Sequence, residues 1–206
     1  YDYCAPLNEY GGYTPAYHAI RELMCAKRGI KPDVLPPEPV LQHIGEVRLS
    51  ECTGLFENEE RIGVKHRSGV PLPMEKYGQN FGLILYRTVL PGDYGTGFVS
   101  LRGLHDTAHI FVNGEKKKTF RRTDEGSLRF KLTGKHSFIA SGVKKGDEIA
   151  VLVDAAGRVN YGEHLYDRKG ISALMFNNQT LMDFDVACFP LDNLDKLDWS
   201  RGAAKF

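Results

Sequence analysis

Five acidic residues in this sequence are candidates for acid–base chemistry, but no short motif joins any two of them. Hydrolysis of a glycosidic bond, for example, needs two carboxyl groups about 5–10 Å apart. The spacing of these acids along the chain does not show which of them meet after folding. Surface positions are therefore the simpler interpretation for all five, which are Glu9, Glu46, Glu75, Asp106 and Glu163.

His105 and His109 form an HxxxH pattern, a spacing with which a helix can present two ligands to zinc. The pair lies in a strand-rich segment and lacks a third ligand, so turn and strand-end positions explain both histidines better. The cysteines form no CxxC pair and support neither a zinc site nor a redox site. We expect no metal and no cofactor. Spacing leaves open two disulfides or four free thiols among Cys4, Cys25, Cys52 and Cys188.

Three further patterns have weak chemical meaning. The stretch Gly157-Arg-Val-Asn-Tyr-Gly162 suggests a phosphate-binding loop, but it lacks the Walker spacing and a following helix pattern, so it predicts a structural turn. Asn178-Gln-Thr180 is a glycosylation sequon, which matters only in a secreted eukaryotic protein. Trp199, ten tyrosines and eleven phenylalanines could stack on sugar rings, but most must fill a core.

The charge balance argues against several classes of function. Lys and Arg total 27 against 26 Asp and Glu, a formal net charge of +1, which gives no electrostatic basis for binding nucleic acid or an anionic membrane. The basic runs Lys116-Lys117-Lys118 and Arg121-Arg122 are interpreted as a solvated strand edge. The sequence contains no apolar stretch of about 18 residues and no charged-then-apolar leader, although it begins at Tyr1 without methionine.

Residues 1–30 contain the only convincing helix. Thr14 suits its N-cap, Pro15 its first position and Gly29 its end. A lone amphipathic helix of this length is marginal in water, so its apolar face needs a packing partner. That face comprises Ala16, Ile20, Leu23 and Met24. Residues 31–43 include four prolines and predict an extended linker between domains.

From about residue 44 to residue 206, short strand signals alternate with turn residues. The strongest is Gly82–Leu90, which is rich in β-branched and aliphatic residues. Asn113-Gly114 predicts a type I′ hairpin between strands at 109–112 and 115–120, because both residues tolerate positive φ. Further strands are expected at 128–132, 147–154, 171–176 and 180–189. This pattern predicts a mainly β domain, an antiparallel sandwich or jelly roll.

Five ordered blocks resemble the glycoside hydrolase family 35 β-galactosidases and cover nearly the whole chain. Tyr1-Asp-Tyr-Cys-Ala-Pro-Leu-Asn-Glu9 is similar to the family's YDYDAPLNE stretch, which ends the eighth strand of a catalytic (β/α)8 barrel. Residues 72–88 resemble PLPMEKLGQNYGLVLYRT, and residues 103–114 resemble GLHDRAQVFVNG. Residues 157–162 and 167–171 match GRVNYG and DRKGI, and Phe189-Pro-Leu-Asp-Asn193 ends the match.

The resemblance implies a parent enzyme that removes terminal non-reducing β-D-galactosyl residues with retention. The family's two catalytic glutamates lie upstream of Tyr1, so no catalytic residue is expected in this chain. Tyr3 matches the second tyrosine of YDYDAP and would contact substrate only with the barrel present; packing of the barrel mouth is the alternative. Cys4 replaces the family's aspartate, a departure that bears on substrate preference. Asp154-Ala-Ala156 replaces the family's Glu-Asn-Met, a departure that bears on one contact surface.

The implied organisation has three parts. Residues 1–30 would be the last barrel strand and helix, residues 31–43 the linker, and residues 44–206 a galactose-binding-like β-sandwich that braces the barrel and shapes its mouth. Residues 1–40 would be held only by docking on the sandwich or on another molecule. The expected partners are β-galactoside glycans, reached through the parent enzyme, the barrel itself and a second copy in a homo-oligomer. The expected location is extracytoplasmic, whether periplasmic, secreted or lysosomal.

Two other classes of function stay open at this point. A free-standing carbohydrate-binding module would use the same sandwich architecture, and an assembly domain would use its strand edges. Affinity of the isolated chain for galactose would favour the module.

Overall fold

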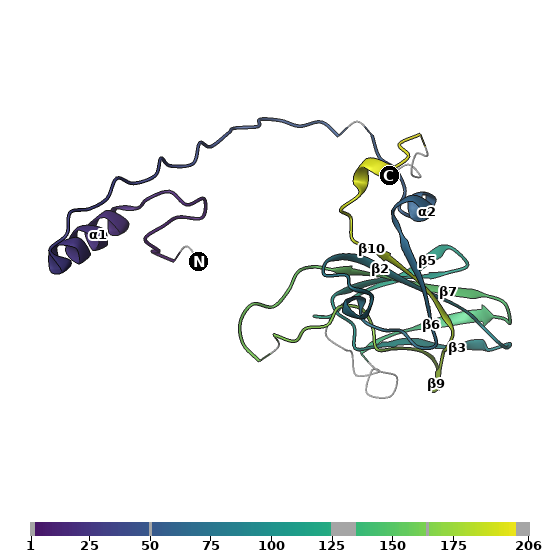
Figure 1. Ribbon diagram of the computed structural model, residues 1–206. Helices are drawn as coiled ribbons and strands as arrows, with labels where there is room; N and C mark the ends of the chain where they lie inside the picture. The colour runs from purple at the N-terminus through teal and green to yellow at the C-terminus, as the bar shows by residue number, and fades with distance from the viewer. Residues whose placement is uncertain (1–2, 50, 125–134, 164, 201–206) are drawn as a thin grey trace. The chain divides into compact units, whose positions relative to one another are not determined.

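The computed structural model describes residues 3–49, 51–124, 135–163 and 165–200. The chain divides into two compact units, Tyr1–Ser50 and Glu51–Phe206 (Figure 1). The strand expected at residues 128–132 lies outside the described residues. Within the described ranges, no helix is both long and apolar enough to cross a membrane.

The first unit contains the predicted helix, α1 (Pro15–Arg28). Thr14 Oγ1 accepts a hydrogen bond from the backbone N–H of Tyr17 at 3.4 Å, and Gly29 ends the helix with a φ of 64°. Both predicted caps are therefore confirmed. No residue of α1 is buried: Leu23, on the predicted apolar face, is 60% exposed. Residues 30–49 have no regular secondary structure, as the proline content predicts.

The second unit is a sandwich of two antiparallel sheets, which confirms the predicted fold class. The larger sheet has the strand order β1-β10-β2-β7-β4-β5 and the smaller has β6-β3-β8-β9. The strands of the larger sheet are β1 (Val64–Ser68), β2 (Gly82–Val89), β4 (Thr107–Val112), β5 (Glu115–Arg121), β7 (Glu148–Ala155) and β10 (Phe184–Phe189). Those of the smaller sheet are β3 (Gly95–Arg102), β6 (His136–Val143), β8 (Ala173–Phe176) and β9 (Gln179–Thr180).

Local chemistry explains both the confirmed and the missed strands. Asn113 and Gly114 have φ values of 50° and 77°, so the β4–β5 hairpin has the predicted turn. The strand expected at 180–189 is instead β9 and β10, separated at Asp183, where φ is 60°. β1, β3 and β6 were not predicted. In β3 the apolar run is interrupted at Gly97, where a Cβ would lie 2.4 Å from the Phe176 ring.

The central strands of the larger sheet are buried on both faces. In β7, Ile149, Val151 and Val153 pack into the main core between the sheets. Ala150 and Leu152 pack on the opposite face in a second, smaller core. This double burial explains why β2 and β7 are continuous apolar runs in the sequence rather than alternating ones.

The outer face of the larger sheet is covered by the segments that precede β1 and follow β10. The first includes a 3-10 turn (Phe56–Asn58) and the short helix α2 (Glu59–Ile62). Asn58 is fully buried and joins the two segments: its Nδ2 donates to Thr53 Oγ1 at 2.8 Å, and its Oδ1 accepts from the Asp198 N–H at 2.7 Å. A polar side chain thereby closes an otherwise apolar second core.

Candidate functional site

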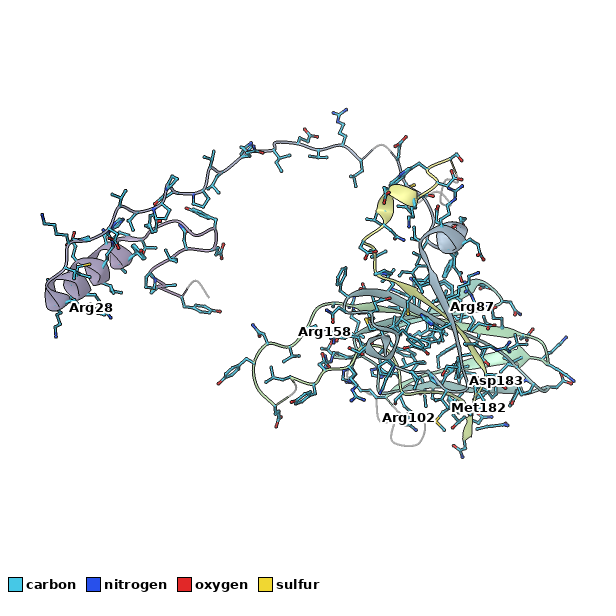
Figure 2. All side chains as sticks on the ribbon, in the orientation of Figure 1. Arg28, Arg87, Arg102, Arg158, Met182 and Asp183 are labelled. Carbon is cyan, nitrogen blue, oxygen red and sulfur yellow. The ribbon has the colours of Figure 1, made fainter. Side chains whose placement is uncertain are left out.

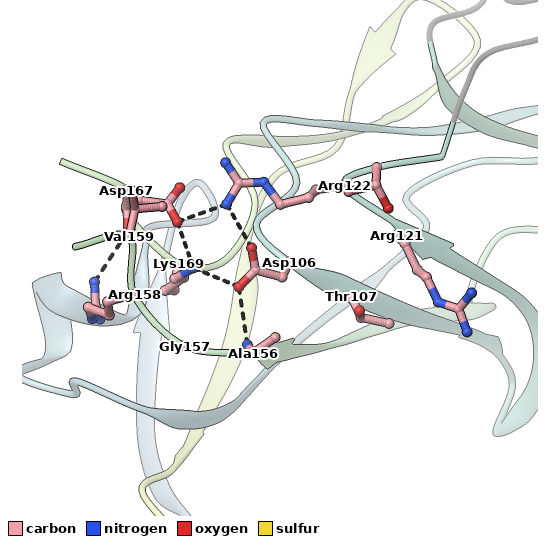
Figure 3. A pocket seen from close by; sticks show the side chains of 11 residues that line it. Asp106, Thr107, Arg121, Arg122, Ala156, Gly157, Arg158, Val159, Asp167 and Lys169 are labelled. Carbon is pink, nitrogen blue, oxygen red and sulfur yellow. Dashed lines mark hydrogen bonds and ion pairs between the residues drawn. The ribbon is translucent and has the colours of Figure 1, made fainter. Parts of the chain in front are cut away.

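A hollow of about 410 Å³ lies at one end of the larger sheet; we call it the β4–β5 hollow. The register pairs Thr107, the first residue of β4, with Arg121 at the end of β5 and with Asp154 near the end of β7. The residues that flank these three strand ends therefore meet at one place. Its lining comprises Asp106, Thr107, Arg121, Arg122, Thr123, Ala156, Gly157, Arg158, Val159, Asp167 and Lys169 (Figure 3).

Four charged side chains at the floor of the hollow form what we call the Lys169 cluster. Lys169 is only 1% exposed, and its Nζ lies 2.6 Å from Asp106 Oδ2 and 2.7 Å from Asp167 Oδ2. Arg122 spans the same two carboxylates, with its Nη1 2.9 Å from Asp106 Oδ1 and 2.8 Å from Asp167 Oδ2 (Figure 3). The backbone N–H of Ala156 also donates to Asp106 Oδ2, at 3.1 Å. Two cations thus neutralise two buried anions.

The cluster keeps both carboxyl groups ionised. Burial on its own would raise the pKa of Asp106, but hydrogen bonds from Lys169 and Arg122 outweigh it, and that pKa falls below its ordinary value. The pKa of Asp167 is lowered for the same reasons, with a further hydrogen bond from His105. The two carboxylates in turn raise the pKa of Arg122, against the opposing effect of its burial. All three groups are therefore charged at neutral pH.

Arg158 fixes the loop that follows β7 beside this cluster (Figure 3). Its guanidinium donates to the backbone oxygen of Asn80 at 3.0 and 2.6 Å, to the backbone oxygen of Asp167 at 3.2 Å, and to Glu75. Glu75 also accepts from the backbone N–H of Lys169 at 2.9 Å. These bonds fix the base of the loop, and Tyr161 beyond it is 86% exposed.

His105 takes part on the other side of Asp167. Its Nδ1 pairs with Asp167 Oδ1. A smaller hollow of about 140 Å³ adjoins this pair and is also lined by Arg122, Glu163 and Tyr166. Tyr166 is 96% exposed.

The structure gathers some of the sequence-based candidates and separates others. Glu75, Asp106 and Glu163 all lie around the two hollows, whereas Glu9, Glu46 and Tyr3 belong to the first unit. Tyr3 is 91% exposed there.

The two histidines of the HxxxH pattern do not form a pair. His109 lies in β4, where its Nδ1 is 3.0 Å from Thr119 Oγ1, while His105 joins Asp167. In the described part of the chain, no group of three His, Cys, Asp or Glu side chains could hold a metal ion. The question of disulfides is settled, since all four cysteines are free thiols.

One interpretation of the basic runs was wrong. Lys116, Lys117 and Lys118 are exposed on β5, an edge strand, as expected. Arg122, however, is not a solvated edge residue, because two buried carboxylates draw its guanidinium inward. Sequence reasoning also missed Asp167 and Lys169. The only signal was their place in one of the family-like blocks, since nothing in the composition marks a lysine as buried.

The comparison with known proteins decides the family. Residues 71–192, more than half of the chain, match the model of the beta-galactosidase first all-beta domain. The chain belongs to this family. Every member of the Lys169 cluster falls inside the matched segment.

Individual β-galactosidases are similar over almost the whole chain. The Bos taurus beta-galactosidase is 33% identical over 95% of this chain and 29% of its own length. The human protein is 31% identical over 95% of this chain and 28% of its own length. The Xanthomonas manihotis protein is 27% identical over 99% of this chain and 32% of its own length. The chain thus spans about 30% of each of these relatives.

Proposed function

We propose that this chain is the non-catalytic C-terminal part of a retaining β-galactosidase of glycoside hydrolase family 35. The whole enzyme would hydrolyse terminal non-reducing β-D-galactosyl residues in an extracytoplasmic compartment. The observation that carries the proposal is the pair of matches: one all-beta domain over residues 71–192, and similarity over 95% of this chain that covers only 29% of a β-galactosidase. Most of such an enzyme therefore corresponds to nothing in this chain.

The chemistry of the Lys169 cluster supports a non-catalytic role. A glycosidase needs one carboxyl group that holds a proton near neutral pH, which requires a raised pKa. Asp106 and Asp167 have lowered pKa values instead, because each carboxylate is bound by Lys169 and Arg122. Neither could donate a proton to a leaving group, so the cluster fits a structural part better than an acid–base pair.

The exposed loop after β7 is the part of the sandwich best suited to contact a catalytic barrel. It carries Tyr161 and Tyr166, 86% and 96% exposed, with Leu165 55% exposed between them. Large side chains left this open are typical of an interaction surface. Docking on the barrel would cover them, brace the two domains and place part of the loop at the barrel mouth.

Residues 1–30 would complete the barrel as its last strand and helix. The uncovered apolar face of α1 and the exposed Tyr3 both fit a segment whose partner is the rest of the barrel. Tyr3 would then contact the substrate, as the resemblance of residues 1–9 to YDYDAPLNE implies.

Hydrolysis of a chromogenic β-galactoside by this chain and by the full-length product of its gene tests the proposal. We expect the long form to cleave and this chain to be inactive. In the long form, Tyr3→Phe should lower kcat/KM, while Tyr10→Phe, in a half-exposed tyrosine of the same unit, serves as the matched control. Cleavage by this chain alone would overturn the non-catalytic role.

A further inference from the structure

We propose that the β4–β5 hollow is a second glycan-binding site, selective for a sugar that carries an anionic substituent such as a sulfate ester or a carboxylate. The inference rests on the proposed function only in taking the ligand to be a carbohydrate. The preference for an anion follows from the hydrogen-bonding groups that the cluster leaves unused.

Most acceptor positions of the two carboxylates on the floor of the hollow are occupied. Each carboxylate oxygen offers about two acceptor positions. Asp106 Oδ2 accepts from Lys169 and from the Ala156 N–H, and Asp167 Oδ2 accepts from Lys169 and Arg122. Asp106 Oδ1 and Asp167 Oδ1 have one partner each, Arg122 and His105, and each keeps one position. A neutral sugar, which must donate as well as accept through its hydroxyls, finds few partners here.

Donors, in contrast, remain in excess. Arg122 has five N–H groups, and among the described residues the two carboxylates bind only those of its Nη1. Arg121 also lines the hollow, with its guanidinium turned away from that of Arg122 (Figure 3), and it forms no ion pair with a carboxylate within the described residues. Thr107 and Thr123 lie in the same lining, and each has a hydroxyl that can donate or accept. The hollow therefore offers one unpaired positive charge and a surplus of donors.

A group with several anionic oxygens, such as a sulfate ester or a carboxylate, is the ligand that matches this surplus of hydrogen-bond donors. Guanidinium groups bind carboxylate and sulfate-like anions by paired, charge-assisted hydrogen bonds, which are about twice as strong as neutral ones. The volume of about 410 Å³ lies in the range of small-molecule sites and leaves room for a sugar ring beside the anionic group. A free inorganic anion would fill only a part of it.

Binding of this chain to galactose 6-sulfate, glucuronate, galactose and inorganic sulfate, measured by calorimetry at constant ionic strength, tests the inference. We expect saturable binding of at least one anionic sugar, with galactose and inorganic sulfate weaker by roughly tenfold or more. The two anionic sugars distinguish a sulfate ester from a carboxylate as the natural group.

Arg121→Gln removes the unpaired charge without touching the Lys169 cluster. It should weaken binding of the anionic sugar by about tenfold or more. Arg102→Gln is the matched control, because Arg102 is an exposed arginine at the end of β3 that does not line the hollow (Figure 2). It should leave the affinity unchanged.

Three results would overturn the inference. They are an absence of saturable binding at millimolar sugar, equal affinity for inorganic sulfate and the anionic sugars, and an equal loss in Arg121→Gln and Arg102→Gln. None of them bears on whether the full-length protein cleaves a β-galactoside, so a failure here leaves the proposed function standing.

Discussion

Replacing Lys169 by Met tests how much the buried cluster contributes to stability. The substitution keeps the length of the side chain and removes the ammonium group that lies 2.6 and 2.7 Å from two carboxylates. Asp106 and Asp167 are 8% and 6% exposed, so water cannot replace the lost partner. Arg122 would then be the only side chain left to bind both anions, with His105 as a second partner of Asp167 alone.

Breaking a buried ion pair by removing one partner costs about 3–5 kcal/mol. For a domain of this size the corresponding fall in Tm is roughly 6–20 °C. Urea unfolding followed by far-UV circular dichroism measures the free energy. Lys116→Met, at an exposed lysine of β5, is the matched control and should change the stability by less than about 0.5 kcal/mol.

The pH dependence of stability gives an independent readout. Asp106 and Asp167 have folded pKa values below the ordinary 3.8, so their contribution is fully present above that pH. It is lost as the pH falls from there through the lowered folded values. The Lys169→Met variant should lose less stability over this acid range than the wild type does. A Tm within about 2 °C of wild type, together with an unchanged acid profile, would refute the reasoning.

Three further substitutions or probes have defined outcomes. Gly170→Ala should cost more than Gly142→Ala in urea unfolding, because both have positive φ but only a Cβ at Gly170 would lie 2.3 Å from the Tyr86 hydroxyl; equal losses would contradict the packing. Burial raises the pKa of the Cys188 thiol to about 11, so a thiol reagent at about pH 8 should label the other three cysteines and reach this one only after unfolding. Asn58→Ala should destabilise the chain by about 1–3 kcal/mol, and a neutral result would show that its buried hydrogen bonds are dispensable.

Local sequence patterns were enough to predict most of the fold. The caps of α1, the Asn113-Gly114 turn and the apolar runs of β2 and β7 each follow from the chemistry of adjacent residues, and all were predicted. β3 was missed because Gly97 interrupts its apolar run to make room for Phe176 of β8, a distant contact that no local window contains.

The site was less predictable than the fold for the same reason. Lys169 is bound by Asp106, which is 63 positions away, and Arg122 by Asp167, which is 45 positions away. Each residue alone suggests a solvated surface charge, which is how Arg122 was interpreted. The register of β4 with β5 places Arg122 beside Asp106, and the bridge between His105 and Gly170 brings Asp167 and Lys169 to them; sequence periodicity contains neither pairing.

The bonds of Asn58 also bear on how the sandwich would respond to mechanical force. They hold residue 53 beside residue 198, so the chain enters and leaves the sandwich at nearly the same point. Tension applied to the polypeptide through these two segments would act on the hydrogen bonds of Asn58 before it acts on any strand of either sheet. The two sheets would lie outside the path of the force and would bear load only after these hydrogen bonds break.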